Sequence, residues 1–243
     1  MGQFVLVHGS WIGGWAFAHV ARGLRTRGHD VYPVTLTGLG ERSHLARREV
    51  NLDTHVDDVV NLLTYEDLRD VVLVGHSYAG IVVSGVVDRV GQRVATVAFL
   101  DTAPATEGQR HIDFYPPDAV ENMQKEVHDR GDGWRLPFPG FEKLGPPPML
   151  AGLGPDARAM LEKRAVMQPF GTYTQPLRMT GKGGDRQRKV LIACNGFREV
   201  AAAQPKIASF LTPQWQRYDL ETGHWAMLSA PEPLAALLDK LAS

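Results

Sequence analysis

The sequence predicts an α/β fold with a mostly parallel sheet, helices on both faces of that sheet, and a helical cap inserted after the fourth strand. Two observations support this prediction. Short apolar runs alternate with helical patterns before residue 103 and again after residue 187, as in successive strand–helix–strand units. Between these two parts, proline- and glycine-rich turns interrupt the pattern over residues 103–187.

The first part of the chain is expected to contain four strands and three helices. The run at 4–8 is continuously apolar, as in a strand that is buried on both faces. Further strands are expected at 31–36, 71–74 and 94–100. Helices are expected over 15–27, closed by Gly28, from just after Thr54 to about 65, and over 81–90. Thr54 and Asp57 resemble a capping box at the start of the second helix.

Residues 103–187, called the cap segment below, contain no apolar run of that kind. Helices are expected at 118–130, stopped by Gly131, and at 155–166. Because a structureless insertion of this length is uncommon in a compact domain, the segment is expected to form a helical cap. A strand at 190–193, a helix at 201–210, a strand at 217–220 and a helix at 233–242 should follow. The chain 1–243 is therefore expected to be one domain with the cap inserted within it.

The composition argues against several classes of protein. Lys and Arg number 26 against 27 Asp and Glu, so the formal net charge is −1 and nothing indicates a nucleic-acid or anionic-membrane partner. No apolar run approaches the ~20 residues of a membrane span. Cys194 is the sole cysteine, so the fold needs no oxidising compartment, and the N-terminus lacks a secretory pattern. We expect a cytoplasmic protein that binds a small-molecule substrate, and a homodimer is left open.

The strongest functional motif is a serine between an expected strand and an expected helix, in the sequence Gly75-His-Ser77-Tyr-Ala79-Gly80. This context is typical of a nucleophile elbow, a strained turn that lifts the serine Oγ off the sheet. The residues two before and two after the serine must be small, and Gly75 and Ala79 meet that need. Ser77 is therefore predicted to be a nucleophile. The alternative is a serine in an ordinary turn.

Two further motifs supply partners for this serine. Thr222-Gly-His224-Trp225 follows the last expected strand, where enzymes with a nucleophile elbow keep their histidine. Because imidazole titrates near neutrality, His224 is predicted to be the general base, although it could instead order its loop. In His8-Gly-Ser10-Trp, after the first strand, backbone N–H groups can face a developing oxyanion. The predicted donors are the N–H groups of Ser10 and Tyr78, and His8 is expected to brace the loop.

These motifs resemble the compact esterase and hydroxynitrile-lyase branch of the α/β-hydrolases, which includes plant methylesterases and bacterial relatives. The matching segments are 4–11, 36–44, 51–58, 75–80, 168–176 and 222–224. The resemblance implies a six-stranded sheet and a mobile helical cap over Ser77. Hydroxynitrile lyases of this branch have a Lys after the catalytic His and a Thr near the oxyanion loop. This chain has Trp225 and Gly9 there, so the resemblance favours hydrolysis.

The third triad residue departs from this branch, in which an Asp normally follows the next-to-last strand. That position falls at or near Phe197, flanked by Asn195 and Glu199. Asp101, at the end of the fourth strand, is a substitute that resembles certain haloalkane dehalogenases and lipases. A carboxylate there could bind His224 on the side away from the serine and fix its tautomer. We predict this hydrogen bond between Asp101 and His224. Three alternatives stay open: Glu199 as the acid, a Ser–His pair without an acid, and a purely structural role for Asp101.

The sequence thus predicts a serine hydrolase that cleaves a small or medium apolar carboxylic ester or lactone through a covalent acyl-enzyme, without metal or cofactor. Aromatic side chains commonly line apolar pockets. The predicted substrate-binding residues are Trp11, Trp134, Phe138, Tyr173 and Trp225. Two alternatives stay open. One is a non-hydrolytic enzyme of secondary metabolism that performs elimination, cyclisation or acyl transfer, and the other is a ligand-binding protein with weak turnover.

Overall fold

The computed structural model describes residues 1–145, 147–198 and 215–242. Its main sheet has six strands in the order β2-β1-β3-β4-β7-β8, and every neighbouring pair is parallel. The six-stranded α/β sheet predicted from the sequence and its resemblance is confirmed. The strands are β1 (Gln3–Val7), β2 (Asp30–Val34), β3 (Val71–His76), β4 (Val94–Leu100), β7 (Arg188–Ala193) and β8 (Gln216–Asp219).

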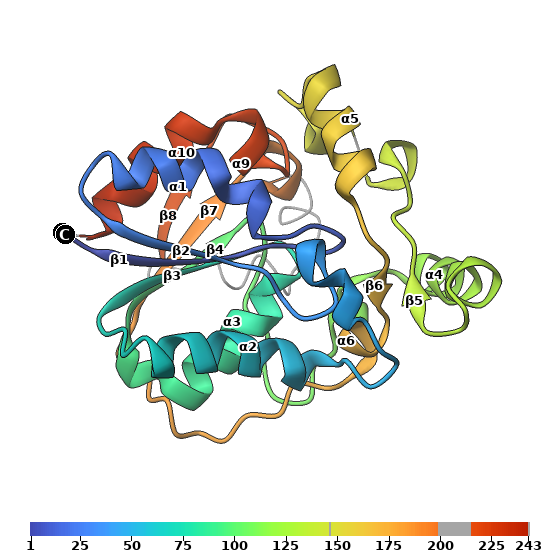
Figure 1. Ribbon diagram of the computed structural model, residues 1–243, viewed down its shortest axis with the longest axis horizontal. Coiled ribbons are helices and arrows are strands. Elements are labelled where there is room, and N and C mark those ends of the chain that lie inside the picture. The colour runs from blue at the N-terminus through green and yellow to red at the C-terminus, as the bar shows by residue number, and fades with distance from the viewer. Residues whose placement is uncertain (146, 199–214, 243) are drawn as a thin grey trace.

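Helices cover both faces of this sheet (Figure 1). One face carries α1 (Ala18–Arg25), α9 (Ala226–Ser229) and α10 (Pro231–Asp239). The other carries α2 (Leu52–Tyr65) and α3 (Ala79–Val90). Because apolar side chains pack on both faces, every residue of the central strand β3 is buried. This two-sided burial explains why the central strands are continuous apolar runs rather than alternating ones.

The ends of several helices differ from the expected ones, and capping explains the clearest case. Helix α2 begins at Leu52 rather than just after Thr54 because Asn51 is its N-cap. The Asn51 side chain accepts the Thr54 N–H at 3.1 Å, and the Thr54 hydroxyl accepts the Asn51 N–H at 3.4 Å. The expected helix at 15–27 is a 3₁₀ turn followed by α1. The helix expected at 201–210 lies outside the described residues.

The cap segment connects β4 to β7, and its described residues add no strand to the main sheet. Its helices are α4 (Pro117–Arg130), α5 (Pro155–Arg164) and α6 (Gly171–Thr174). A short antiparallel pair, β5 (Arg135–Leu136) with β6 (Gln168–Pro169), also belongs to it. Figure 1 shows α4, α5 and this pair beside the end of the sheet at which the parallel strands finish. Functional groups gather at that end in open parallel sheets.

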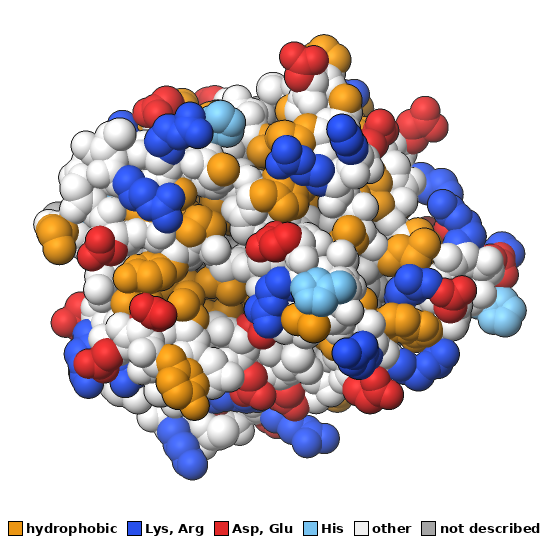
Figure 2. Space-filling view, in the orientation of Figure 1, with side chains coloured by type: hydrophobic (Ala, Val, Ile, Leu, Met, Phe, Trp, Pro, Cys, Tyr) orange, Lys and Arg blue, Asp and Glu red, His pale blue; other side chains and the backbone are white. Residues whose placement is uncertain are grey.

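The surface carries both signs of charge. Lys and Arg side chains are interspersed with Asp and Glu over the face shown in Figure 2, in keeping with the balanced composition. Within the described residues, no helix is both long enough and apolar enough to cross a bilayer.

Candidate active site

Ser77 directly follows β3 and has a φ of 54°, a left-handed backbone conformation that residues other than glycine rarely adopt. Its N–H donates to the carbonyl of Leu100 in the neighbouring strand at 3.1 Å. Gly75 is required two residues earlier, because a Cβ there would lie 2.7 Å from a Val83 methyl and 2.8 Å from the Ala79 carbonyl. Strand, strained turn and helix therefore form the elbow geometry that presents a serine hydroxyl.

His224, in the loop after β8, lies between Ser77 and Asp101. Its Nε2 is 2.9 Å from Ser77 Oγ, and its Nδ1 is 2.6 Å from Asp101 Oδ2. The Asp101 side chain is 1% exposed, and as a carboxylate it can only accept. The proton therefore lies on His224 Nδ1, which leaves Nε2 free to accept the serine proton. The predicted hydrogen bond between Asp101 and His224 is present.

Asp101 is held in place by hydrogen bonds to β7 and to the residue that follows it. It follows β4 with a φ of 51°, and its N–H donates to Ile192 O at 2.8 Å. Its second carboxylate oxygen, Oδ1, accepts the Cys194 N–H at 2.8 Å. Phe197, at or near the position at which the resemblance predicts the acid, is 8% exposed and packs in the hydrophobic core. Glu199, the alternative acid, lies outside the described residues.

The loop after β1 packs directly against the elbow, since a Cβ on Gly9 would lie 3.0 Å from Ser77 Cβ. His8 braces this loop: its Nδ1 donates to Gly9 O at 2.7 Å, and its Nε2 accepts the Leu36 N–H at 3.1 Å. Burial lowers the pKa of His8 to about 4 and keeps it neutral. Because a trans peptide directs its C=O and N–H oppositely, the bond at Gly9 O fixes the direction of the Ser10 N–H.

The two predicted oxyanion donors are the N–H groups of Ser10 and Tyr78. Neither donates a hydrogen bond to any atom of the described residues. Both residues are buried, with exposures of 7% and 0%. A buried N–H group without a partner is costly, so both groups are available for an oxygen atom of a bound molecule.

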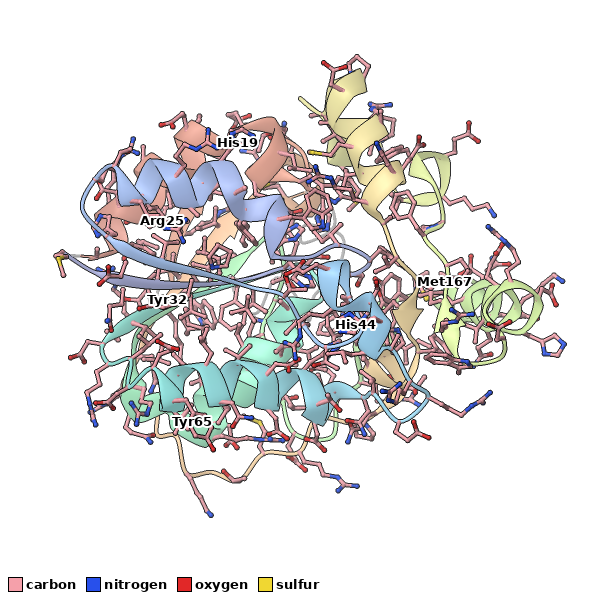
Figure 3. All side chains as sticks on the ribbon, viewed as in Figure 1. His19, Arg25, Tyr32, His44, Tyr65 and Met167 are labelled. Atoms are coloured by element: carbon pink, nitrogen blue, oxygen red, sulfur yellow. The ribbon has the colours of Figure 1, made fainter. Side chains whose placement is uncertain are left out.

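Two further buried histidines support this arrangement without adding charge. His76 Nε2 donates to the carbonyl of His224 at 2.8 Å, and burial lowers the pKa of His76 well below its usual value. His55 accepts the Tyr78 hydroxyl at 2.9 Å, and burial lowers its pKa to about 4. By contrast, His19 and His44 are exposed, at the surface of the molecule (Figure 3). No three His, Cys, Asp or Glu side chains in the described residues are grouped so that they could hold a metal ion.

A series of aromatic rings leads from the oxyanion loop to the histidine. Successive ring centroids are 5.8, 5.6, 6.1 and 5.0 Å apart. The series is Trp11, Phe138, Phe141, Trp225 and His224. Phe141 was not among the predicted binding residues, because nothing in its sequence context separates it from the other aromatic residues of the cap segment.

Two of the predicted binding residues lie elsewhere. Tyr173 has no exposed surface, and its hydroxyl oxygen is 2.6 Å from Ser10 Oγ while its ring stacks on Tyr78 with centroids 5.7 Å apart. We therefore correct its expected role from substrate contact to support of the oxyanion loop. Trp134 is not part of the aromatic series, and its ring centroid lies 5.0 Å from Cζ of Arg135.

The cap segment is hydrogen-bonded to loops on both sides of the serine. On the oxyanion side, the Val166 N–H donates to Trp11 O at 2.9 Å, and Trp11 Nε1 donates to Leu136 O at 3.1 Å. On the other side, the His224 N–H donates to Met149 O at 2.7 Å. The cap segment therefore contributes directly to the position of the loop after β1 and of the loop that carries His224.

Known proteins are similar to this chain over almost its whole length. The sequence model of the Alpha/beta hydrolase family matches residues 4–237. A carbendazim-hydrolysing esterase from Nocardioides sp. (strain SG-4G) is 34% identical over 254 residues, which cover 99% of this chain and 100% of that protein. Methylesterase 10 of Arabidopsis thaliana is 26% identical over 259 residues, with 99% and 92% covered. The solved structure of an extracellular alpha/beta-hydrolase from a Paenibacillus species has a TM-score of 0.81 and 24% identity, covering 100% of this chain and 99% of its own.

Proposed function

Because this chain belongs to the alpha/beta hydrolase family, we propose that it hydrolyses a small or medium apolar carboxylic ester or lactone, with Ser77 as nucleophile. The observation that carries the proposal is the unbroken hydrogen-bonded series at the end of the sheet. Ser77 Oγ is 2.9 Å from His224 Nε2, and His224 Nδ1 is 2.6 Å from Asp101 Oδ2. Ester chemistry is supported by the relatives, which are an esterase and a methylesterase.

In the acylation step, Ser77 Oγ attacks the carbonyl carbon of the ester while His224 Nε2 takes the hydroxyl proton. The carbonyl electron pair moves onto oxygen, and the resulting oxyanion accepts hydrogen bonds from the N–H groups of Ser10 and Tyr78. Asp101 stabilises the imidazolium that forms. When the oxyanion collapses, the bond to the alcohol oxygen breaks, His224 returns the proton to that oxygen, and the acyl group stays on Ser77.

Deacylation repeats these steps with water. His224 takes a proton from a water molecule, whose oxygen attacks the acyl carbon of the ester on Ser77. The same two N–H groups stabilise the second oxyanion. Its collapse releases the carboxylic acid, and the proton held by His224 returns to Ser77 Oγ, so the enzyme is regenerated.

The aromatic series beside the triad supports an apolar substrate. Phe138 and Phe141 belong to the cap segment, and both are partly exposed, whereas Trp225 next to His224 is 5% exposed. Rings of this kind bind apolar acyl or alcohol groups mainly through buried area. We infer that one side of the ester lies against these rings.

A fluorophosphonate probe tests the nucleophile, because only an activated serine is labelled rapidly. The wild-type protein should be labelled at Ser77, and Ser77→Ala should be neither labelled nor active on a p-nitrophenyl ester, with a rate loss on the order of 10⁶. Ser43→Ala, which changes an exposed serine, is the matched control. If Ser77→Ala keeps more than about a tenth of the rate, covalent catalysis by Ser77 is wrong.

Hydrolysis in water labelled with ¹⁸O separates the proposed reaction from elimination, cyclisation or acyl transfer to another acceptor. The carboxylic acid product should carry one labelled oxygen, because water attacks the acyl-enzyme. A product without the label would contradict hydrolysis. The esterase and methylesterase names of the two relatives described above favour hydrolysis over the non-hydrolytic and the ligand-binding alternatives.

We also propose a cytoplasmic location. The support is chemical: Cys194 is the sole cysteine of the chain, so no disulfide has to form in an oxidising compartment. Fractionation of the source cells, followed by detection of the protein in each fraction, tests this proposal.

A further inference from the structure

Trp11, the residue after the oxyanion donor Ser10, has a strained backbone. Its φ of 64° lies in the left-handed region that a bulky residue rarely adopts. Such a conformation persists only where surrounding contacts hold it. The Trp11 N–H donates to Gln168 Oε1 at 3.2 Å, and the Trp11 carbonyl accepts the Val166 N–H at 2.9 Å. Both groups that hold this conformation therefore belong to the cap segment.

Hydrogen bonds fix the orientation of the Gln168 side-chain amide. It has no exposed surface. Its Nε2 donates to Thr172 Oγ1 at 2.8 Å, and that hydroxyl in turn donates to Pro169 O at 2.6 Å. Because the threonine proton is committed to a carbonyl, the threonine oxygen must accept from the glutamine NH₂. The amide oxygen of Gln168 is thus directed at Trp11.

A second contact fixes the neighbouring residue. Ser10 Oγ is 2.6 Å from the hydroxyl oxygen of Tyr173, which is fully buried. Ser10 is therefore held by its own side chain and through the peptide that joins it to Trp11. Both partners, Tyr173 and Gln168, lie within six residues of each other in the cap segment.

We propose that Gln168 is a positioning residue for the oxyanion site. By holding the Trp11 N–H it fixes the peptide after Ser10, while the His8 bond to Gly9 O fixes the peptide before it, and together they keep the Ser10 N–H directed at the oxygen of the tetrahedral intermediate. This inference rests on the proposed ester hydrolysis. Hydrogen bonds to that oxygen strengthen only as charge develops on it, so they stabilise the transition state more than the bound ester. Loss of the Gln168 contact should therefore lower kcat and leave KM nearly unchanged.

The test is Gln168→Met, which keeps the length of the side chain and removes the acceptor for the Trp11 N–H. Removing an oxyanion donor costs about 10²–10³ in kcat, so misdirecting one should cost roughly tenfold or more, with KM altered less than about twofold. Affinity for a trifluoromethyl ketone, which forms a tetrahedral adduct on Ser77, should fall by a similar factor.

Gln175→Met is the matched control. Gln175 also belongs to the cap segment and makes two hydrogen bonds to Asp53 on α2, at 3.0 Å through Oε1 and at 2.6 Å through Nε2. It contacts neither Ser10 nor Trp11 through any hydrogen bond of the described residues. This variant should lose thermal stability to a similar extent and keep the wild-type kcat.

Two results would overturn the inference. One is a Gln168→Met variant whose kcat stays within about twofold of wild type, and the other is an equal loss of kcat in Gln175→Met. Should Gln168→Met not fold, Gln168→Asn replaces it, because the shorter side chain withdraws the acceptor oxygen from the Trp11 N–H; a kcat within about twofold of wild type there would overturn the inference as well. If the wild-type protein neither hydrolyses esters nor labels at Ser77, the proposed function itself fails, and the inference falls with it.

Discussion

Ser77 and Asp101 occupy equivalent positions at the ends of two neighbouring strands. Each is the residue that follows its strand, with φ angles of 54° and 51°. Each donates its N–H to the next strand of the sheet, Ser77 to Leu100 at 3.1 Å and Asp101 to Ile192 at 2.8 Å. The same type of turn therefore follows both β3 and β4, and it presents the serine after β3 and the carboxylate of Asp101 after β4. Two residues of the proposed triad, Ser77 and Asp101, are therefore positioned by the central strands, whereas His224 lies in the loop after β8.

Asp101→Asn should reduce ester hydrolysis by about 10⁴, because the amide would stabilise the wrong tautomer of His224, as in the analogous serine-protease variant. The Cys194 N–H would still find a carbonyl acceptor, so the fold should persist. Turnover of a p-nitrophenyl ester measures the effect. Asp70→Asn is the control, since Asp70 also has a left-handed backbone, at φ 51°, but is exposed. An Asp101→Asn variant near the wild-type rate would show that the carboxylate is structural.

Gly9→Ala should impair catalysis through crowding at the elbow. The added methyl would lie 3.0 Å from Ser77 Cβ and 2.9 Å from His76 Nδ1, so one of these groups has to move. A displacement near 1 Å at reacting groups can cost about a hundredfold in rate. Steady-state kinetics beside a thermal melt separates this loss from unfolding. Gly154→Ala, where the methyl would meet no atom within 4 Å and φ is −68°, should behave as wild type.

Acid should destabilise the protein through its buried neutral histidines. Burial lowers the pKa of His8 and of His55 from 6.5 to about 4 in the folded state. Between these values the unfolded chain binds more protons than the folded one, so stability is complete above pH 6.5 and is lost as the pH falls toward 4. At pH 5, which is 1.5 units below 6.5, each histidine should cost about 2 kcal/mol.

Urea unfolding at pH 7.5 and at pH 5 measures this loss of unfolding free energy. Burial also lowers the pKa of His76 and of His111, so four histidines contribute comparably at pH 5. His55→Gln should therefore remove roughly a quarter of the difference between the two pH values. His19→Gln, at an exposed site, should leave the difference unchanged. Equal unfolding free energies at the two pH values would contradict the assignment of neutral buried histidines.

Phe138→Ala should weaken the binding of esters with a bulky apolar group. The Phe138 ring lies between Trp11 and Phe141, at 5.8 and 5.6 Å, so its loss opens the middle of the aromatic series. An apolar contact of this size is worth about 1–3 kcal/mol, so KM for an aryl ester should rise roughly tenfold, with a smaller change for an acetate. Tyr65→Ala, at a side chain that is 86% exposed at the end of α2 (Figure 3), is the control. Equal changes for both esters would argue against contact between the rings and the substrate.

The sequence predicted those features that depend on local pattern. Continuous apolar runs predicted the buried strands, and the small residues around Ser77 predicted the sharp turn that follows β3. The predicted start of α2 was wrong. The sequence suggested a capping box between Thr54 and Asp57, whereas the structure has one between Asn51 and Thr54. Several residues can satisfy a capping pattern, and only the backbone conformation selects one of them.

Features that depend on distant contacts were not predictable in the same way. Gln168 was visible only as part of a family-like segment, and its bond to Trp11 joins residues 157 positions apart. Tyr173 was expected at the substrate because it is aromatic, yet it packs on Tyr78 and binds Ser10. Asp101 could be proposed because the end of a strand is a recognisable place in the sequence. The hydrogen bond it accepts from the Cys194 N–H joins residues 93 positions apart, so the local sequence around Asp101 could not predict it.

The contact between Ser10 and Tyr173 should make substitutions at these two positions, which lie 163 residues apart, depend on each other. Both residues are buried, and losing the Tyr173 hydroxyl would leave Ser10 Oγ without its partner at a cost of about 1–3 kcal/mol. Homologues that lack the tyrosine hydroxyl should therefore also lack the serine hydroxyl, and the two positions should co-vary in an alignment. The same constraint applies to chimaeric proteins. A cap segment taken from a relative will fit this chain only if its residue at the position of Tyr173 is compatible with Ser10.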